Sequence, residues 1–326
     1  MLQSIIYLGI SFILTAIIGK IVIPMLKKLK AQQSERWDGP RTHLRKQGTP
    51  TMGGIIMIIA LLLITIGVYI YCKLTNISRN VDNLIPLLMV SIGFGIVGFI
   101  DDFKKLVLKN TKGLKPSYKM LGLLIISVIY VLYLIYGINI GTGTEIPILK
   151  TYINLPIYIY IPFAIIVMLG TTNAINLTDG IDGLSSSVSA IIITCLTTMG
   201  ILFGIWEISA FGSIVVGTIV GFLMFNLHPA KVFMGDTGSL FLGGIISAMA
   251  LYIKVPLILL VIALIPVIET ISVMIQVIYF KKTGKRFFKM APLHHHFELS
   301  GWKESKIVII FSLITLVLCV IGLIIV

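Results

Sequence analysis

The run at residues 307–326 reads IVIIFSLITLVLCVIGLIIV and contains no charged side chain. An α-helix rises about 1.5 Å per residue, so about 20 apolar residues cross the hydrocarbon core of a bilayer. Runs of the same kind lie at residues 55–71 and 84–100. These runs predict transmembrane helices, and the fold depends on how many of them the chain holds.

Composition places the whole chain in the same class. Hydrophobic residues make up 57% of it and charged residues 12%, with a mean hydropathy of +1.04, whereas a soluble domain is about 25% charged. An ordinary soluble protein is therefore excluded, and we predict an all-α polytopic membrane protein in which residues 1–326 form a single domain. Ten runs are candidate spans, at about residues 2–25, 52–71, 84–100, 120–140, 156–172, 184–204, 208–225, 238–253, 256–280 and 307–326.

Two details of this pattern bear on the number of spans. The first run has no basic segment before it and no small-residue cleavage site after it, so we expect a retained helix and not a signal peptide. Only Gly204, Ile205, Trp206 and Glu207 separate the sixth run from the seventh. This spacing predicts a tight hairpin with an interfacial tryptophan, and a single long bent helix is the alternative.

Lysine and arginine residues predict the orientation, because short loops rich in them stay on the cytoplasmic side. Most of the 26 such residues follow odd-numbered runs. The loops after even-numbered runs hold only Lys73, Arg79, Lys150 and Lys254. Both termini are therefore expected on the outer face. The net charge of +13 has a plainer interpretation as well, since positive loops also hold anionic lipid headgroups.

With this orientation, four polar clusters fall on the cytoplasmic side and can converge. The first is Asp101-Asp102 at the end of the third run. Neighbouring carboxylates on a helix diverge by about 100°, so one can face a site while the other faces a cation or a backbone amide. Helix termination with local lysine pairing is the alternative, but two acids at the C-terminal end of a helix oppose its dipole.

The second cluster is the stretch Asn173-Ala-Ile-Asn176-Leu-Thr-Asp179-Gly-Ile-Asp182-Gly183, which directly follows an apolar run. A carboxylate costs about 2.5–3.5 kcal/mol at a bilayer centre on insertion scales. Paired acids beside a membrane segment therefore indicate a functional site.

The third and fourth clusters lie at residues 226–239 and 291–298. Asp236, in the sequence Gly-Asp-Thr-Gly, precedes an apolar run and is a natural N-cap. The backbone N–H groups at such a helix start can also receive phosphate oxygens or a hydrated metal. The consecutive His294, His295 and His296 could indicate a zinc site, but consecutive side chains do not share one face, so contact with phosphate or substrate is favoured over zinc or a plain loop.

Several aspartates, many lysines and three histidines on one membrane face favour phosphoryl transfer. Carboxylates suit Mg²⁺, which prefers one or two of them together with substrate phosphates and waters, and lysines and histidines stabilise the remaining phosphate charge. An ion-coupled membrane transporter is the rival hypothesis, because intramembrane acids also act as relays. Only Glu269 lies inside a run, however, and one such acid makes a weak relay.

The motifs resemble those of the polyprenyl-phosphate N-acetylhexosamine-1-phosphate transferases across nearly the whole chain. Asp101-Asp102, residues 173–183 and residues 226–236 carry this likeness. Within the superfamily, residues 48–54 and 292–298 resemble the phospho-N-acetylmuramoyl-pentapeptide transferases. The resemblance implies Mg²⁺-dependent transfer of phospho-MurNAc-pentapeptide from UDP-MurNAc-pentapeptide to undecaprenyl phosphate, which gives lipid I and UMP for peptidoglycan synthesis.

The resemblance also implies a homodimer of ten-helix subunits in the bacterial cytoplasmic membrane. The active site would face the cytoplasm, membrane lipids would surround the helices, and no nucleic-acid partner is expected. A relative that transfers GlcNAc-1-phosphate from UDP-GlcNAc to undecaprenyl phosphate is the alternative within the superfamily, but the histidine motif favours the muramyl substrate.

Site roles are implied residue by residue. Asp236 resembles the principal Mg²⁺ ligand, with Asp101 and Asp102 beside the metal and the diphosphate. The implied catalytic residues are Asp101, Asp102, Asp236, His294, His295 and His296. The implied substrate contacts are Lys46, Thr51, Lys105, Lys119, Asn173, Asn176, Asp179, Asp182, Asn226, Phe233, Gln276 and Ala291.

Among these contacts, Asn173, Asn176 and Asp179 match positions near the diphosphate, and Asp182, Asn226 and Phe233 match the nucleoside pocket. The family's candidate for a general base is Asp101. A phosphate monoester with a second pKa near 6 is, however, largely dianionic at neutral pH and can attack unaided. A two-step route through an aspartyl-phosphate is also open.

Overall fold

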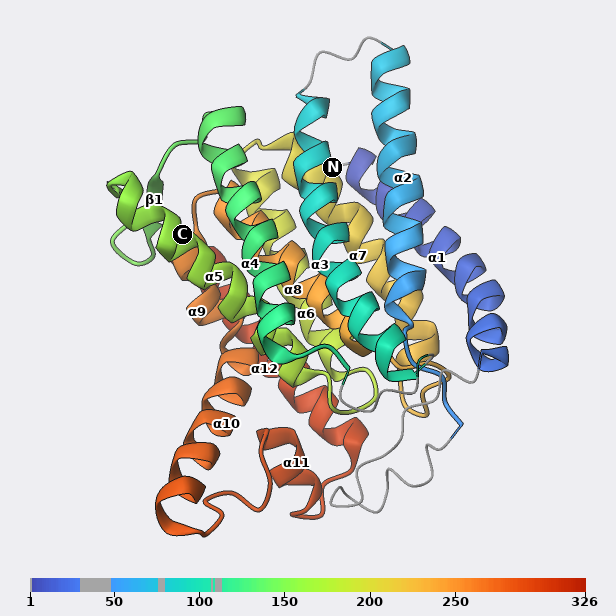
Figure 1. The fold of residues 1–326 in the computed structure, drawn as a ribbon. Helices are drawn as coiled ribbons and strands as arrows, with labels where there is room; N and C mark the ends of the chain where they lie inside the picture. Colours follow the sequence, from blue (N-terminus) through green and yellow to red (C-terminus); the bar gives the residue numbers. More distant parts are fainter. Residues whose placement is uncertain (1, 30–47, 76–79, 107, 109–112) are drawn as a thin grey trace.

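The computed structural model describes residues 2–29, 48–75, 80–106, 108 and 113–326. Nearly all of its secondary structure is helical (Figure 1). In chain order the elements are α1 (Leu2–Lys28), α2 (Gly54–Leu74), η2 (Val81–Asn83), α3 (Leu84–Leu106), α4 (Pro116–Leu132), η3 (Tyr133–Gly137), β1 (Gly143–Ile146), β2 (Thr151–Asn154), α5 (Ile157–Thr178), α6 (Leu184–Leu202), α7 (Trp206–Asn226), α8 (Gly235–Tyr252), η4 (Pro256–Ile258), α9 (Leu259–Ile262), α10 (Leu264–Thr283), α11 (Leu293–Glu298) and α12 (Glu304–Ile325).

Within the described ranges, nine helices are long and apolar enough to cross a membrane. This finding confirms the prediction of a polytopic helical membrane protein. The predicted hairpin between the sixth and seventh runs is confirmed too, because α6 ends at Leu202, α7 begins at Trp206 and the two helices pack together.

Helix α8, which corresponds to the eighth predicted run, is not among the nine. It lies in the middle of the bundle (Figure 1) and packs along α3 and α5. Every residue of α8 from Thr237 to Tyr252 is buried. Because protein rather than lipid surrounds α8, the helix can contain small and weakly polar residues and need not be as apolar as a lipid-facing helix. Gly98 permits the close approach of α3, since a Cβ at that position would collide with the Asp236 carbonyl.

Two helix boundaries and one additional element differ from the prediction. Helix α3 continues to Leu106, so Asp101 and Asp102 lie more than one turn before its end and not at the end. Helix α4 begins at Pro116, which places Lys119 on a helix instead of in a loop. A short antiparallel hairpin, β1 with β2, follows α4 and η3, so the fold is not entirely helical.

The ninth predicted run is interrupted. It divides into α9 and α10 at Ala263, and Pro266 cannot donate a backbone hydrogen bond to the Ile262 carbonyl. Figure 1 shows α10 leaving the bundle toward α11.

Opposite ends of the bundle have different contents. The β1–β2 hairpin lies at the end where α8 and α12 finish, because the backbone N–H of Glu145 donates to the Lys254 carbonyl and that of Ile148 to the Ile325 carbonyl. The other end holds the end of α5 and the starts of α8 and α12. Asp102 in the last turns of α3 and Lys119 in the first turn of α4 reach the start of α8 there.

Candidate active site

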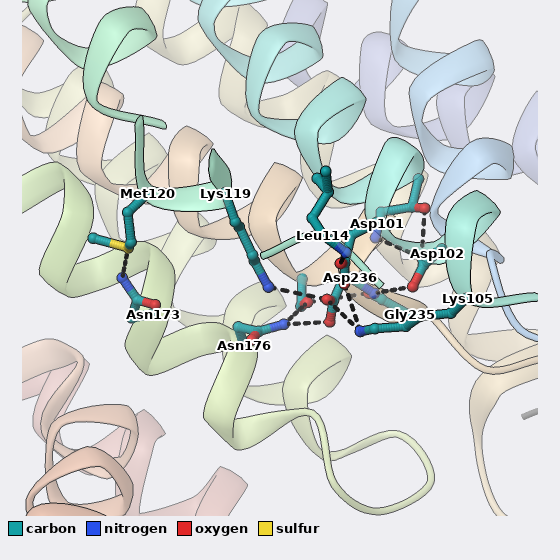
Figure 2. A network of polar contacts seen from close by, with 12 residues as sticks. Asp101, Asp102, Lys105, Leu114, Lys119, Met120, Asn173, Asn176, Gly235 and Asp236 are labelled. Atoms are coloured by element: carbon teal, nitrogen blue, oxygen red, sulfur yellow. Dashed lines mark hydrogen bonds and ion pairs between the residues drawn. The ribbon is translucent and has the colours of Figure 1, made fainter. Parts of the chain in front are cut away.

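Three carboxylates from two helices meet at the start of α8. Asp101 and Asp102 project from α3 and Asp236 from α8, and one oxygen of each lies within 4.8 Å of the others. Figure 2 shows the three side chains directed toward one another. The predicted convergence of the first and third polar clusters is therefore present in the structure.

Asp102 caps the N-terminus of α8. Its Oδ1 accepts the Asp236 N–H at 3.2 Å, and its Oδ2 accepts the Thr237 N–H at 2.9 Å and the Thr237 hydroxyl at 2.6 Å. The prediction that Asp236 is the N-cap is wrong: Met234 occupies that position, and Asp236 lies in the first turn. A cap from another helix leaves the Asp236 carboxylate available for other partners.

The Asp236 carboxylate forms ion pairs with two lysines and a hydrogen bond with one side-chain amide. Its Oδ2 lies 2.9 Å from the Lys119 Nζ and 3.1 Å from the Lys105 Nζ, and its Oδ1 accepts the Asn176 amide at 2.9 Å (Figure 2). The Asn176 Nδ2 also donates to the Ser239 hydroxyl at 2.8 Å. Side chains from α3, α4 and α5 thus meet on one carboxylate of α8.

Asp101 has a different environment. Its Oδ2 pairs with Lys105 one turn away, and its Oδ1 accepts the Leu114 N–H at 2.7 Å. The divergence expected for two adjacent acids is therefore present in their partners, since Asp101 faces a cation and a loop amide and Asp102 faces a helix N-terminus.

Asp179 follows α5 as its C-cap residue. Burial, together with the negative charges of Asp236, Asp102 and Asp182, raises the pKa of Asp179 to about 8. A carboxyl with this pKa is mostly protonated at pH 7 and can donate a hydrogen bond.

Asp182 belongs to a second cluster, with His228 and Glu304. Its Oδ2 lies 2.9 Å from the His228 Nδ1 and accepts the Ala230 N–H at 3.1 Å, and the Asp182 N–H donates to Glu304 at 3.4 Å. The Asp182 side chain is only 2% exposed. These contacts connect the α5–α6 loop, the α7–α8 loop and the start of α12.

Asn226 and Phe233 hold the α7–α8 segment in place. The Asn226 amide donates to the Val232 carbonyl at 3.0 Å and accepts the Ser186 hydroxyl at 2.7 Å. The Phe233 backbone pairs with Pro50 and Gly53. In the structure as described, Asn226 is buried and already partnered, whereas Phe233 is partly exposed.

The remaining predicted contacts are distributed differently. Thr51 lies beside Gly235 and Asp102, since a Cβ built on Gly235 would lie 2.8 Å from its hydroxyl. Among the described residues, Asn173 donates to Leu169 and Met120 and not to the acids (Figure 2).

Gln276 accepts the N–H groups of Phe287 and Phe288. Ala291 is partly buried and lies before α11. Lys46 lies outside the described residues.

The three histidines lie on the short helix α11 and have three different surroundings. His294 is fully buried against Glu269. His295 Nδ1 lies 2.7 Å from the Glu298 Oε2, and His296 Nδ1 accepts the Lys289 N–H at 3.2 Å. Consecutive residues on a helix point about 100° apart, which explains why these rings do not converge on one point.

Sequence reasoning did not assign several residues that complete the cluster. Thr237 and Ser239 bind Asp102 and Asn176, and Leu114 contributes its backbone N–H to Asp101. The sequence Gly-Asp-Thr-Gly-Ser was a usable signal for the first two, because it places hydroxyls in the first turn of a helix. No side-chain pattern could have indicated the Leu114 amide.

Comparison with known proteins identifies relatives across the chain. The family model described as glycosyl transferase family 4 matches residues 84–254. The chain is 46% identical over 314 residues to a phospho-N-acetylmuramoyl-pentapeptide-transferase of Acetivibrio thermocellus. The aligned residues make up 96% of this chain and 92% of that protein. A protein with the same name from Clostridium botulinum is 47% identical over 311 residues, which are 95% of this chain and 93% of that protein. Another from Halalkalibacterium halodurans is 45% identical over 303 residues, which are 93% of this chain and 91% of that protein.

Proposed function

The chain belongs to the family of phospho-N-acetylmuramoyl-pentapeptide-transferases, and we propose that it carries out its reaction at the cluster around Asp236. As a member of this family it is a phosphotransferase that moves phospho-N-acetylmuramoyl-pentapeptide onto a lipid carrier in peptidoglycan synthesis. We assign UDP-MurNAc-pentapeptide as the donor and undecaprenyl phosphate as the acceptor, with lipid I and UMP as products.

The observation that best supports this site is the meeting of two ammonium groups on one carboxylate oxygen. Lys105 and Lys119 both approach the Asp236 Oδ2, and both side chains remain partly exposed. Long lysine side chains can turn from a carboxylate to an arriving phosphate without movement of the backbone. Positive groups held at the reacting phosphates stabilise the charge that develops during transfer.

The charges of the cluster fit a divalent cation. Three carboxylates face two ammonium groups, so an ionised cluster has an excess of negative charge and would repel a diphosphate on its own. The donors are hard oxygens, which Mg²⁺ prefers. We propose that Asp236 and Asp101 hold Mg²⁺, and that the ion supplies positive charge to the diphosphate when it is bound.

Asp102 has a supporting role in this proposal. Both of its oxygens already accept hydrogen bonds from the start of α8, so it holds Asp236 in position and is poorly placed to act as a base or a nucleophile. Asp101 is engaged with Lys105 and the Leu114 amide. We therefore propose direct attack by the dianionic phosphate of the acceptor, without an aspartyl-phosphate.

A burst measurement separates direct attack from the two-step route. Purified protein is mixed with UDP-MurNAc-pentapeptide and Mg²⁺ in the absence of the lipid acceptor. Direct attack requires that UMP appears only after undecaprenyl phosphate is added. Release of one UMP per active site without acceptor would contradict it.

Substrate choice is tested by comparing two donors. We expect UMP release with UDP-MurNAc-pentapeptide and undecaprenyl phosphate, and none with UDP-GlcNAc. UMP release from UDP-GlcNAc but not from UDP-MurNAc-pentapeptide would favour the GlcNAc-1-phosphate alternative. Flux of a substrate across sealed vesicles without Mg²⁺-dependent UMP release would instead favour the transporter hypothesis.

We also propose ten spans, including α8, with both termini on the outer face of a bacterial cytoplasmic membrane and the Asp236 cluster on the cytoplasmic face. The distribution of lysine and arginine supports this orientation. Cysteine in the Lys285→Cys variant should react only from the cytoplasmic side, and cysteine in Lys150→Cys only from outside. The reverse labelling would contradict the orientation.

The family resemblance further supports a homodimer. Light scattering of the detergent-purified protein should give twice the chain mass of 35.9 kDa after subtraction of the detergent. A monomer with full activity would remove this part of the proposal.

A further inference from the structure

Ser239 provides a hydroxyl beside the Asp236 cluster, and the proposed reaction has no step for it. It lies one turn after Gly235 in α8 and is fully buried. Its Oγ donates to the Gly235 carbonyl at 3.1 Å and accepts the Asn176 Nδ2 at 2.8 Å. The hydroxyl therefore connects the start of α8 to the last turn of α5, where Asn176 lies.

The hydrogen bonds around Ser239 can run in only one direction. A carbonyl cannot donate, so the single hydroxyl hydrogen of Ser239 lies toward the Gly235 carbonyl. Its oxygen is then only an acceptor toward Asn176. The Asp236 carboxylate, which faces two lysines, is also only an acceptor, and its Oδ1 lies 2.9 Å from the same Nδ2. Asn176 must therefore present its NH₂ group, and not its oxygen, to both neighbours.

Both hydrogens of the Asn176 amide are used in this arrangement, one on Asp236 and one on Ser239. Figure 2 shows the amide nitrogen directed toward Asp236. A reversed amide would place its oxygen against two acceptors at hydrogen-bond distance, which is unfavourable in a largely buried site. Asp236 and Ser239 therefore fix the orientation of the amide between them.

The two oxygens of Asp236 have partners of different kinds. Oδ2 faces Lys105 and Lys119, which are long side chains that can turn to an arriving phosphate. Oδ1 faces the Asn176 amide, which is held a second time by Ser239. When the lysines turn to a phosphate, the amide is the side-chain contact that still fixes the plane of the carboxylate. Residues that orient a metal ligand in this way set the affinity for the metal without touching it.

We propose that Ser239 is a positioning residue for Asp236 that acts through the Asn176 amide. It holds the carboxylate in the orientation that binds a divalent cation, and it contacts neither the cation nor the substrate. This role deepens the proposed function and rests on it, since it gives the same metal and diphosphate site a supporting residue.

Ser239→Ala removes the second partner of the amide and leaves Asn176 and Asp236 in the chain. We expect the Kd of Mn²⁺, measured by EPR without nucleotide, to rise about 10- to 100-fold, the range found when a residue that orients a metal ligand is lost. The Mg²⁺ concentration that gives half-maximal UMP release should rise by a similar factor. Normal Mn²⁺ affinity in the folded variant would overturn the proposal.

Ser247→Ala is the matched control. Ser247 lies on the same helix, is also fully buried and donates to the Gly243 carbonyl at 2.9 Å. Within the described part of the chain, its hydroxyl binds only carbonyls of α8. Ser247→Ala should therefore leave Mn²⁺ affinity unchanged, with a Tm close to that of Ser239→Ala. Equal losses of Mn²⁺ affinity in the two variants would overturn the proposal, because they would reflect a general loosening of α8.

A double variant tests whether Ser239 acts through Asn176. In Asn176→Ala the hydroxyl has no amide to hold, so the further change Ser239→Ala should alter Mn²⁺ affinity by less than about twofold. A further loss as large as that in the wild-type background would mean that Ser239 acts by another route, and would also overturn the proposal.

If Ser239→Ala does not fold, Ser239→Cys takes its place, because a thiol is a weaker acceptor than a hydroxyl. Its Kd for Mn²⁺ should still rise, and a normal Kd would overturn the proposal. The proposed function fails separately: Mn²⁺ binding that depends on Ser239 as described, without UMP release from UDP-MurNAc-pentapeptide, would contradict that function and still support the positioning role.

Discussion

Two clusters of acids lie at opposite ends of the same short segment, residues 176–182, and they are built in different ways. At one end Asn176 joins the cluster around Asp236, where two flexible lysines provide the positive charge. At the other end Asp182 is held by a histidine and a backbone N–H. Both sets could hold a metal by residue type and distance.

The difference lies in whether the partners can leave. A lysine ammonium can move from a carboxylate to a phosphate, whereas the Ala230 N–H at Asp182 moves only if the loop moves. We therefore expect substitutions in the Asp236 cluster to reduce catalysis, and substitutions in the Asp182 cluster to reduce stability. This contrast can be tested by measuring turnover and thermal unfolding for the same set of variants.

The largest effect is expected for Asp236→Asn. The substitution keeps the shape of the side chain but removes the charge that holds Lys105, Lys119 and the proposed Mg²⁺. UMP release should fall by more than about 10³-fold, with little loss of thermal stability. Unchanged activity and Mg²⁺ dependence would remove the metal assignment.

Lys119→Met should have the next largest effect, about 10²- to 10³-fold on kcat, because it removes one positive group from the reacting phosphates. Lys115→Met is the matched control, since Lys115 is exposed and lies just before α4. Steady-state rates of UMP release compare the two. Equal losses in both variants would mean that general surface charge, not the contact with Asp236, is responsible.

Asp182→Asn should mainly reduce stability. The buried carboxylate accepts from His228 and the Ala230 amide, and weakening such bonds costs about 1–3 kcal/mol. We expect a lower Tm and a change in kcat much smaller than that of Asp236→Asn. A loss of donor affinity without a loss of stability would instead support the nucleoside contact that the family resemblance implies.

The smallest effect concerns Asp179 and pH. Its carboxyl has a pKa of about 8 in the folded protein against an ordinary value of 3.8, so the folded state holds this proton more tightly than the unfolded state. Wild-type stability should therefore fall relative to Asp179→Asn as pH rises from about 4 to about 8, and the difference should level off above that range. Thermal unfolding of both proteins across this range checks the sign, and parallel curves would contradict it.

The helical fold could be predicted from the sequence because each apolar run carries its own signal. The burial of α8 among the other helices could not be predicted in this way, because it depends on how they pack around it. The break at Ala263 was only partly predictable: proline marks a weak point in a helix, but whether the helix bends or divides depends on packing. The β1–β2 hairpin was missed because four-residue strands leave little pattern.

The candidate site was predictable in its residue types and less so in its contacts. The aspartates and asparagines were found from their placement beside apolar runs, whereas the individual lysines were implied by the family resemblance. That Asp102 caps α8 could not be found in this way, because the contact joins residues 134 and 135 positions apart. For the same reason Asp236 was mistaken for its own helix cap.

The position of the metal site can be measured directly from the binding of Mn²⁺ in place of Mg²⁺, by EPR with UMP present. Wild type and Asp182→Asn should both bind the ion, and Asp236→Asn should lose it, because we propose that the metal and the diphosphate bind at Asp236. Retention of Mn²⁺ by Asp236→Asn together with its loss in Asp182→Asn would contradict this assignment and place the metal site at the Asp182 end of residues 176–182.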